Sequence, residues 1–213
     1  MRPDLVIFDC DGVLVDSEPI AVRANVAVGA DLGWAITEAE VVDLFVGRSA
    51  VSIAGVIAGR VGASAAVEWE RRFAELHGAA LASELTAVAG VVEVLDALDA
   101  AGVPYCVASS GTHEKMRGTL GVTGLYPRFA GRIFSATEVA EGKPAPDLFL
   151  HAARRLGGAR AVVVEDSRYG ARAARAAGMR CYGYAGGVTP GEWLAQEGAV
   201  VFGDMRELTG LLL

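Results

Sequence analysis

Two aspartates with the right spacing for catalysis, Asp9 and Asp11, follow a short apolar run that begins at Leu5. Carboxylates placed directly after a buried segment are costly unless they share a cation or a proton. Gly12 comes next and permits an unusual backbone turn. The pair suits a nucleophile, Asp9, beside a general acid and base, Asp11. The same residues also fit a solvated loop in which Asp11 is a turn residue.

A second pair of acids, Glu165 and Asp166, follows the apolar run Val162-Val163-Val164. Two carboxylates at a buried strand end favour a bound metal ion. The chain has no cluster of histidines and no closely spaced cysteines, so Mg²⁺ is favoured over zinc. The alternative is that Asp166 or Ser167 caps the helix that follows.

Groups that could hold an anion occur at two further positions. Ser109 and Ser110 stand where an apolar run gives way to a helix, which offers hydroxyls and free backbone N–H groups. Lys143, one of only two lysines, is fixed between a glycine and a proline. A compact ammonium fits between a carboxylate and a phosphoryl oxygen better than a planar guanidinium does. An ordinary helix cap and a surface turn are the simpler interpretations.

The elements that position these groups alternate along the chain. Apolar runs predict strands at 4–9, 103–108, 161–164, 180–184 and 199–202, and more weakly near 133–134. Helical spacing predicts helices at 90–101, 145–156 and 167–177, and another that opens at Thr189 as its capping residue. This alternation predicts an α/β fold with a doubly wound, mainly parallel, Rossmann-like sheet. The functional site is expected at the carboxyl ends of the strands.

Residues 17–85 break the alternation, because they contain only helical patterns. A capping box begins at Thr37, an apolar amphipathic stretch covers 49–59, and a long helix covers 67–85. We therefore predict a small all-α cap domain at 17–85, inserted into an α/β core formed by 1–16 and 86–213.

Bulk properties narrow the function classes. A net charge of −7 argues against a nucleic-acid partner. No uncharged run approaches the about 20 residues of a membrane span, and the first residues lead into a strand rather than a signal peptide, so we expect a cytoplasmic protein. We also expect a monomer. The cysteines are read as reduced core thiols: Cys10, Cys106 and Cys181.

Taken together, these residues resemble the four motifs of the haloacid dehalogenase-like hydrolases. The motif residues are Asp9-x-Asp11-Gly12-Val13, Ser109, Gly142-Lys143-Pro144 and Glu165-Asp166. The resemblance covers essentially the whole chain, and the helical insert is similar to the family's α-helical cap. Asp16-Ser17-Glu18 and the segment 142–147 resemble the branch that contains sugar-phosphate phosphatases, phosphoglycolate phosphatase and β-phosphoglucomutase.

The resemblance implies that Asp9 forms an aspartyl-phosphate and binds Mg²⁺. It also implies that Asp11 protonates the leaving oxygen, then activates water, and lends its backbone carbonyl to the metal. Asp11 also distinguishes phosphate ester hydrolysis from dehalogenation within the family, because dehalogenases of similar fold lack this second aspartate. A halide leaving group needs no acid, so Asp11 favours phosphate esters.

The remaining motif residues would bind ligands. The resemblance implies that Asp166 binds Mg²⁺, with Glu165 in or beside its coordination shell. Ser109 and the Ser110 backbone would hold phosphoryl oxygens, and Lys143 would offset negative charge. This fits phosphoryl transfer, in which positioning and charge neutralisation carry most of the catalysis.

A phosphosugar mutase of the β-phosphoglucomutase type is the alternative. In the mutase pattern a histidine lies in the first cap helix and an arginine lies three residues after the cap-loop glycine. Residues 17–30 contain no histidine, and Ala50 stands three residues after Gly47. These two differences disfavour the mutase. Arg48 lies next to Gly47 and could take the place of that arginine, so the mutase stays an alternative.

The predicted substrate is a small phosphorylated metabolite, a sugar or sugar-acid phosphate. The cap loop at Gly47 and Arg48 would select the leaving group, and Glu18 could bind a hydroxyl. Arg48 as a solvated residue at a helix start is the simpler interpretation. A non-catalytic regulator that binds such a metabolite is the rival class, but it would be expected to lose a catalytic aspartate or the motif lysine. All three histidines are read as structural or surface residues away from the motifs: His77, His113 and His151.

Overall fold

A six-stranded parallel sheet forms the centre of the computed structural model, which describes residues 2–213. The spatial order is β3-β2-β1-β4-β5-β6. The strands are β1 (Leu5–Phe8), β2 (Tyr105–Ser109), β3 (Ile133–Ser135), β4 (Ala161–Glu165), β5 (Arg180–Tyr184) and β6 (Val200–Phe202). Each neighbouring pair is parallel, and all six predicted strands are present. The α/β fold class is confirmed.

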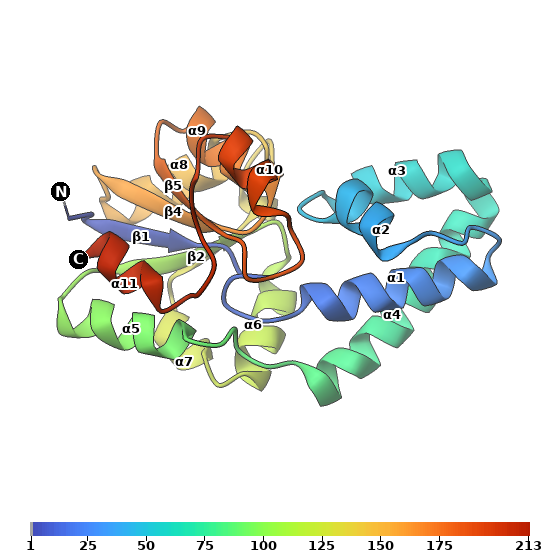
Figure 1. The fold of residues 1–213 in the computed structure, drawn as a ribbon, viewed down its shortest axis with the longest axis horizontal. Helices are drawn as coiled ribbons and strands as arrows, with labels where there is room; N and C mark the ends of the chain where they lie inside the picture. Colours follow the sequence, from blue (N-terminus) through green and yellow to red (C-terminus); the bar gives the residue numbers. More distant parts are fainter. Residues whose placement is uncertain (1) are drawn as a thin grey trace.

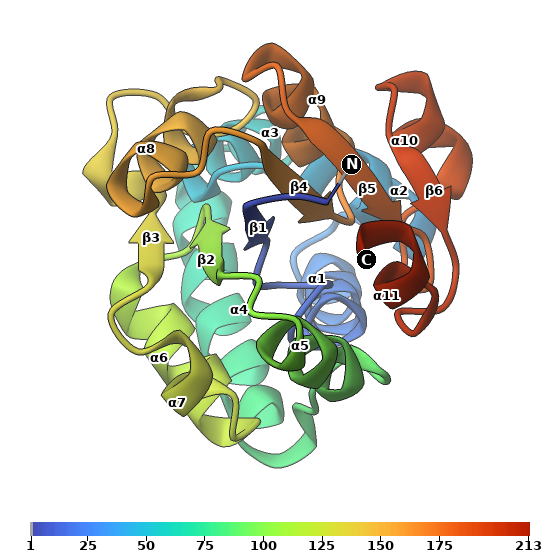
Figure 2. The ribbon, with the colours of Figure 1, turned by 90° about the vertical axis from the view of Figure 1, so that its left-hand side faces the viewer.

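Strand β1 lies mid-sheet, and its side chains alternate between the two faces. Val6 and Phe8 belong to a core shared with helices α5 (Val91–Ala100), α6 (His113–Val122) and α11 (Glu207–Leu212). Leu5 and Ile7 pack on the other face with helices α8 (Asp147–Leu156) and α9 (Arg168–Ala176). All four side chains are fully buried, as a strand covered on both faces requires. Figure 2 shows the two helical layers on opposite sides of the sheet.

The core helices follow the predicted alternation. They are α5 (Val91–Ala100), α6 (His113–Val122), α7 (Tyr126–Phe129), α8 (Asp147–Leu156), α9 (Arg168–Ala176), α10 (Gly191–Gln196) and α11 (Glu207–Leu212), with a 3₁₀ turn η1 at Ala136–Glu138. Across residues 2–213, no helix combines the length and apolar character needed to cross a bilayer.

The capping predicted at Thr189 is wrong. Helix α10 starts only at Gly191, and its N-cap is Pro190, which has an extended ψ of 129° and makes no side-chain cap. The Thr189 hydroxyl is buried without a hydrogen-bond partner. The intervening proline holds the chain extended, so Thr189 is too far from the first turn to cap it.

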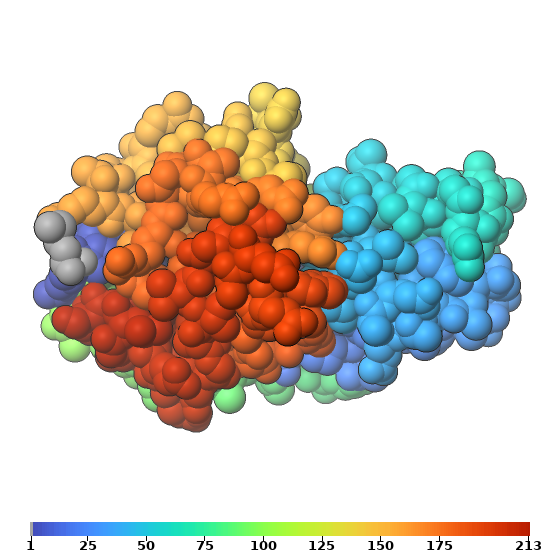
Figure 3. Space-filling model, turned by 45° about the horizontal axis from the view of Figure 1, so that its top comes forward, coloured from blue at the N-terminus to red at the C-terminus, as the bar shows by residue number. Residues whose placement is uncertain are grey.

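The helical insert consists of α1 (Glu18–Asp31), α2 (Glu38–Phe45), α3 (Ala50–Val61) and α4 (Ala63–Glu84). These helices lie to one side of the sheet and form a lobe beside the core (Figures 1 and 3). Their buried side chains make a separate hydrophobic cluster, and the capping box at Thr37 is confirmed. We propose this lobe as the cap; the boundaries at 17 and 85 stay predictions.

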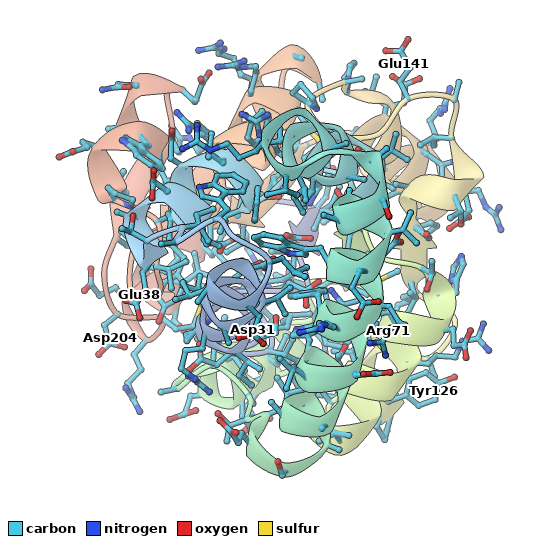
Figure 4. The ribbon with its side chains drawn as sticks, turned by 90° about the vertical axis from the view of Figure 1, so that its right-hand side faces the viewer. Asp31, Glu38, Arg71, Tyr126, Glu141 and Asp204 are labelled. Atoms are coloured by element: carbon cyan, nitrogen blue, oxygen red, sulfur yellow. The ribbon has the colours of Figure 1, made fainter. Side chains whose placement is uncertain are left out.

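The lobe's own core is aromatic. Trp34, Phe45 and Trp69 pack with ring centroids 5.7–6.4 Å apart. The Trp69 indole N–H donates to Asn25 Oδ1 at 3.0 Å, which satisfies a buried donor. Seen from the cap end, Asp31 and Arg71 lie on the outer side of the lobe (Figure 4). The cap therefore has charges outside and a packed interior.

The three cysteines are free and buried, as predicted. Burial raises the pKa of Cys106 to about 12 and raises the pKa values of Cys10 and Cys181 above their usual range. Because the thiolate is the reactive form, we expect none of them to react with iodoacetamide in the native protein. Mass spectrometry should show three labels only after unfolding. Native labelling as fast as that of the unfolded chain would contradict this burial.

Candidate active site

The predicted catalytic residues converge at one cavity of about 590 Å³ between the sheet and the helical lobe. Strands β2, β1 and β4 are neighbours, so their carboxyl ends bring Ser109, Asp9 and Glu165 together. The cavity lining includes these predicted site residues: Asp9, Asp11, Glu18, Gly47, Arg48, Ser109, Ser110 and Lys143. Glu165 and Asp166 are buried next to it.

Gly12 allows the first loop to pack directly against Asp166. Its φ is +75°, in the left-handed region, and a Cβ atom there would lie 2.0 Å from Asp166 Oδ2. Any side chain would therefore collide with this carboxylate as well as strain the backbone. The glycine keeps the β1 and β4 loops in contact.

Three buried acids form a cluster suited to a divalent cation. Asp9, Glu165 and Asp166 each offer an oxygen within 4.8 Å of the others. Burial raises the pKa of Asp9 to about 6 and raises the pKa of Asp166 well above its usual value. Asp166 Oδ2 is buried with no hydrogen-bond partner. Buried carboxylate oxygens that lack a partner are what a hard cation requires, so the residues fit a Mg²⁺ site.

Lys143 joins two of these acids. Its Nζ lies 2.8 Å from Asp9 Oδ1 and 2.6 Å from Glu165 Oε1. Burial lowers the pKa of Lys143, but the two carboxylates outweigh this and raise it above the usual range. Glu165 is further satisfied by the N–H and hydroxyl of Ser167. Asp166 is thus the acid of the pair left freer to bind a cation.

Asp11 is held by two donors. Ser17 Oγ donates to Asp11 Oδ1 at 2.7 Å, and Lys115 Nζ donates to Oδ2 at 2.8 Å. Burial raises the pKa of Asp11, but Lys115 and Ser17 more than offset this, so the pKa lies below its usual value. Sequence reasoning missed Lys115. The scarcity of lysine that pointed to Lys143 applies to Lys115 as well, and was the available signal.

Neither Ser109 nor Ser110 is the N-cap of helix α6. Thr112 caps α6 by accepting from the Lys115 N–H. Ser109 is buried at the end of β2, and its hydroxyl accepts from the Gly111 N–H at 3.2 Å. Ser110 is exposed. Both serines therefore remain available to an anion in the cavity. The helix cap that was the simpler interpretation of this segment is formed by Thr112 instead.

The cap loop docks on the core beside the site. A Cβ atom on Gly47, whose φ is +75°, would lie 2.6 Å from Ser167 Cβ. The Arg48 guanidinium lies 5.2 Å from the centroid of the Tyr169 ring, and its Nε is buried without a hydrogen-bond partner. Arg48 is therefore not a solvated helix-start residue. Glu18 also lines the cavity, and burial raises its pKa to about 7.

The prediction that the histidines lie away from the motifs is wrong for His77. It lines the same cavity, stacked on Phe73 with centroids 4.8 Å apart, and its Nε2 is buried without a partner. Burial, aided by Lys115, lowers its pKa to about 4. His77 lies in the second half of the long helix α4, which extends from the cap toward the core. Helical periodicity does not show where along the helix this contact with the core occurs. His113 and His151 both bond Glu138.

The family model for haloacid dehalogenase-like hydrolases matches residues 3–178. The chain belongs to this family. It is 33% identical over 184 residues to the 6-phosphogluconate phosphatase of Escherichia coli (strain K12), covering 85% of this chain and 82% of that protein. The chain is a phosphoric monoester hydrolase. Haloacid dehalogenase-like hydrolases generally use a divalent metal, and the acidic cluster is compatible with one.

Two solved structures share the whole fold. A haloacid dehalogenase-like protein from Agrobacterium tumefaciens has a TM-score of 0.86 at 34% identity, covering 98% of this chain and 97% of that one. A family hydrolase from Deinococcus radiodurans, solved with bound phosphate and sodium, has a TM-score of 0.80 at 33% identity. It covers 99% of this chain and 98% of its own.

Proposed function

We propose that this haloacid dehalogenase-like hydrolase is a Mg²⁺-dependent phosphatase for small sugar or sugar-acid phosphates. The observation that carries the proposal is that Asp9 and Asp11 line one cavity with Ser109 and Lys143. Asp9 also belongs to the acidic cluster with Glu165 and Asp166. The 6-phosphogluconate phosphatase among the relatives supports this substrate class. A monomer and a cytoplasmic location stay predictions.

In the first half of the proposed reaction, an Asp9 oxygen attacks phosphorus and the bond to the ester oxygen breaks. Asp11 gives its proton to that oxygen, and the alcohol departs. The phosphoryl group stays bonded to Asp9 as an aspartyl-phosphate. Ser109 and the Ser110 backbone hold phosphoryl oxygens while Lys143 neutralises charge. Mg²⁺, held by Asp9, Asp166 and the Asp11 carbonyl with Glu165 in or beside its shell, would supply further charge neutralisation.

In the second half, water attacks the phosphorus and its proton passes to Asp11. The bond between phosphorus and Asp9 breaks, which releases inorganic phosphate and restores the carboxylate. Lys115 keeps Asp11 ionised, the form that accepts this proton. The first half needs a protonated Asp11, and Oδ2 of the protonated carboxyl can still accept the hydrogen bond from Lys115.

Phosphate release tests the proposal directly. We expect Mg²⁺-dependent release of inorganic phosphate from an aryl phosphate, abolished by EDTA, and a ranking by kcat/KM over a panel of phosphorylated metabolites led by sugar or sugar-acid phosphates. An isomeric phosphosugar in place of inorganic phosphate would support the mutase alternative. Binding of a metabolite without turnover would support the regulator.

Metal binding should depend on pH in a defined direction. The pKa of Asp9 is raised from 3.8 to about 6 by burial, so the folded state holds this proton more tightly than the unfolded chain does. Without metal, the stability from this group is present at low pH and is lost as pH rises through about 6. A protonated carboxyl cannot bind a cation, so the increase in Tm on adding Mg²⁺ should be larger at about pH 8 than at about pH 5.

Thermal unfolding in EDTA and in Mg²⁺ at the two pH values measures this difference. Asp166→Asn should lose most of the Mg²⁺-dependent increase in Tm, because it removes the freest of the clustered carboxylates. An equal increase at both pH values, or one that survives in Asp166→Asn, would place the metal elsewhere.

A further inference from the structure

Lys115 lies on the side of the cavity where the leaving group must sit. Its Nζ is 2.8 Å from Asp11 Oδ2, and its side chain is 41% exposed, so a ligand can reach it. To pass a proton, Asp11 must come within about 3 Å of the ester oxygen. Nζ then lies within roughly 6 Å of that oxygen. This distance matches a substituent on the carbon next to the phosphorylated one.

The other cations that line the cavity, Lys143 and Arg48, form no ion pair with Asp11. Lys143 is fixed between Asp9 and Glu165, and its side chain is only 2% exposed. Arg48 is stacked over Tyr169 on the cap side. Among the cations that line the cavity, Lys115 is therefore the one placed to contact the leaving group beside the ester.

The charges around Lys115 decide which substituent it can accept. Two carboxyl groups accompany the ammonium, because Asp11 Oδ2 lies 2.8 Å from Nζ and Glu18 lines the same cavity. A substrate carboxylate only accepts hydrogen bonds, so at Nζ it would face the Glu18 oxygens with no proton to donate to them. A hydroxyl group both donates and accepts, so it can bridge the Lys115 ammonium and the Glu18 carboxyl. His77, on α4, also lines the cavity, and its Nε2 is buried without a hydrogen-bond partner.

We propose that Lys115 is a specificity residue that binds a hydroxyl on the carbon next to the phosphorylated carbon. The enzyme then prefers phosphate esters of polyols and sugars to phosphate esters of 2-hydroxy acids. This inference rests on the proposed function and narrows its substrate class.

Three small esters separate the possibilities: glycerol 1-phosphate carries the neighbouring hydroxyl, propyl phosphate lacks it, and 2-phosphoglycolate has a carboxylate there. With Mg²⁺, we expect kcat/KM for glycerol 1-phosphate to exceed that for propyl phosphate by about tenfold or more, and also to exceed that for 2-phosphoglycolate. In Lys115→Met the ratio of glycerol 1-phosphate to propyl phosphate should fall to about one. The ratio cancels any general loss from a displaced Asp11, because both esters need the same acid.

Arg117→Met is the matched control, because it removes an exposed cation from the same helix and should leave the ratio unchanged. A wild-type preference for 2-phosphoglycolate, no discrimination by the wild type, or an unchanged ratio in Lys115→Met overturns the inference. If Lys115→Met does not fold, Lys115→Gln replaces it and should lower the ratio in the same direction. Failure to hydrolyse even an aryl phosphate counts against the proposed function, whereas hydrolysis without discrimination counts only against the role of Lys115.

Discussion

Asp9→Asn should lower kcat/KM for phosphate esters by at least about a thousandfold. The neutral amide oxygen is a far weaker nucleophile than a carboxylate and cannot form a stable bond to phosphorus, so the covalent half-reaction is lost. Asp9 directly follows the central strand β1 and is 8% exposed, so its carboxylate is held at the carboxyl end of the sheet. Phosphate release in saturating Mg²⁺ measures the loss.

The variant should stay folded, because Lys143 keeps its bond to Glu165 at 2.6 Å when Asp9 becomes neutral. Asp16→Asn is the matched control: it makes the same chemical change on an exposed residue of the same loop and should keep activity near the wild-type value. Activity of Asp9→Asn within tenfold of the wild type would exclude nucleophilic catalysis by Asp9.

The sheet could be predicted because its strands are buried on both faces. Leu5 to Phe8 form an unbroken apolar run, which is what a central parallel strand requires. The spatial order of the strands does not follow from such runs, since β1 pairs with β2 and β4, which lie far along the chain. The strand ends still indicated which residues lie together at the candidate site, because the parallel arrangement brings every carboxyl end to one edge.

The partners of the proposed catalytic acids could not be predicted in the same way. Lys115 bonds Asp11 across 104 residues of sequence, and His77 reaches the cavity from a cap helix whose docking depends on packing. The residue types alone did not separate Glu165 from Asp166; the family resemblance implied that Asp166 binds Mg²⁺ with Glu165 in or beside its shell. The structure separates them, because Lys143 and Ser167 satisfy Glu165 and leave Asp166 Oδ2 without a partner.

Whether a predicted helix cap formed depended on the backbone conformation of the residues between the capping residue and the first turn. Thr37 and Glu40 form the predicted reciprocal cap, because Thr37 is extended and the helix begins at the next residue. Thr189 has a similar sequence context, but Pro190 delays the helix until Gly191. A capping box at Ser135 and Glu138, which the sequence analysis did not single out, forms around the short turn η1. The pattern of residue types is therefore insufficient without the starting point of the helix.

Lys143→Met should impair both activity and stability. The ammonium is the charge that lowers the pKa of Asp9, so its removal favours the protonated, unreactive nucleophile and leaves phosphoryl oxygens without a partner. We expect kcat/KM to fall by about a hundredfold to a thousandfold, as for the loss of one donor to a developing anion. Without metal, the free energy of unfolding should fall by about 3 kcal/mol, because Asp9 and Glu165 are left buried with no counter-charge.

A double-mutant cycle tests whether this loss comes from the contact with Asp9. In the Asp9→Asn background one of the two carboxylates is already neutral, so Lys143→Met should cost less stability there than in the wild type. Denaturant unfolding in EDTA gives the four free energies, and the coupling should be about 1 kcal/mol or more. Repeating the series in Mg²⁺ should reduce the cost of Lys143→Met, because a bound cation replaces part of the missing charge. Equal costs of Lys143→Met in both backgrounds would mean that the lysine stabilises the fold through Glu165 alone and does not tune the nucleophile.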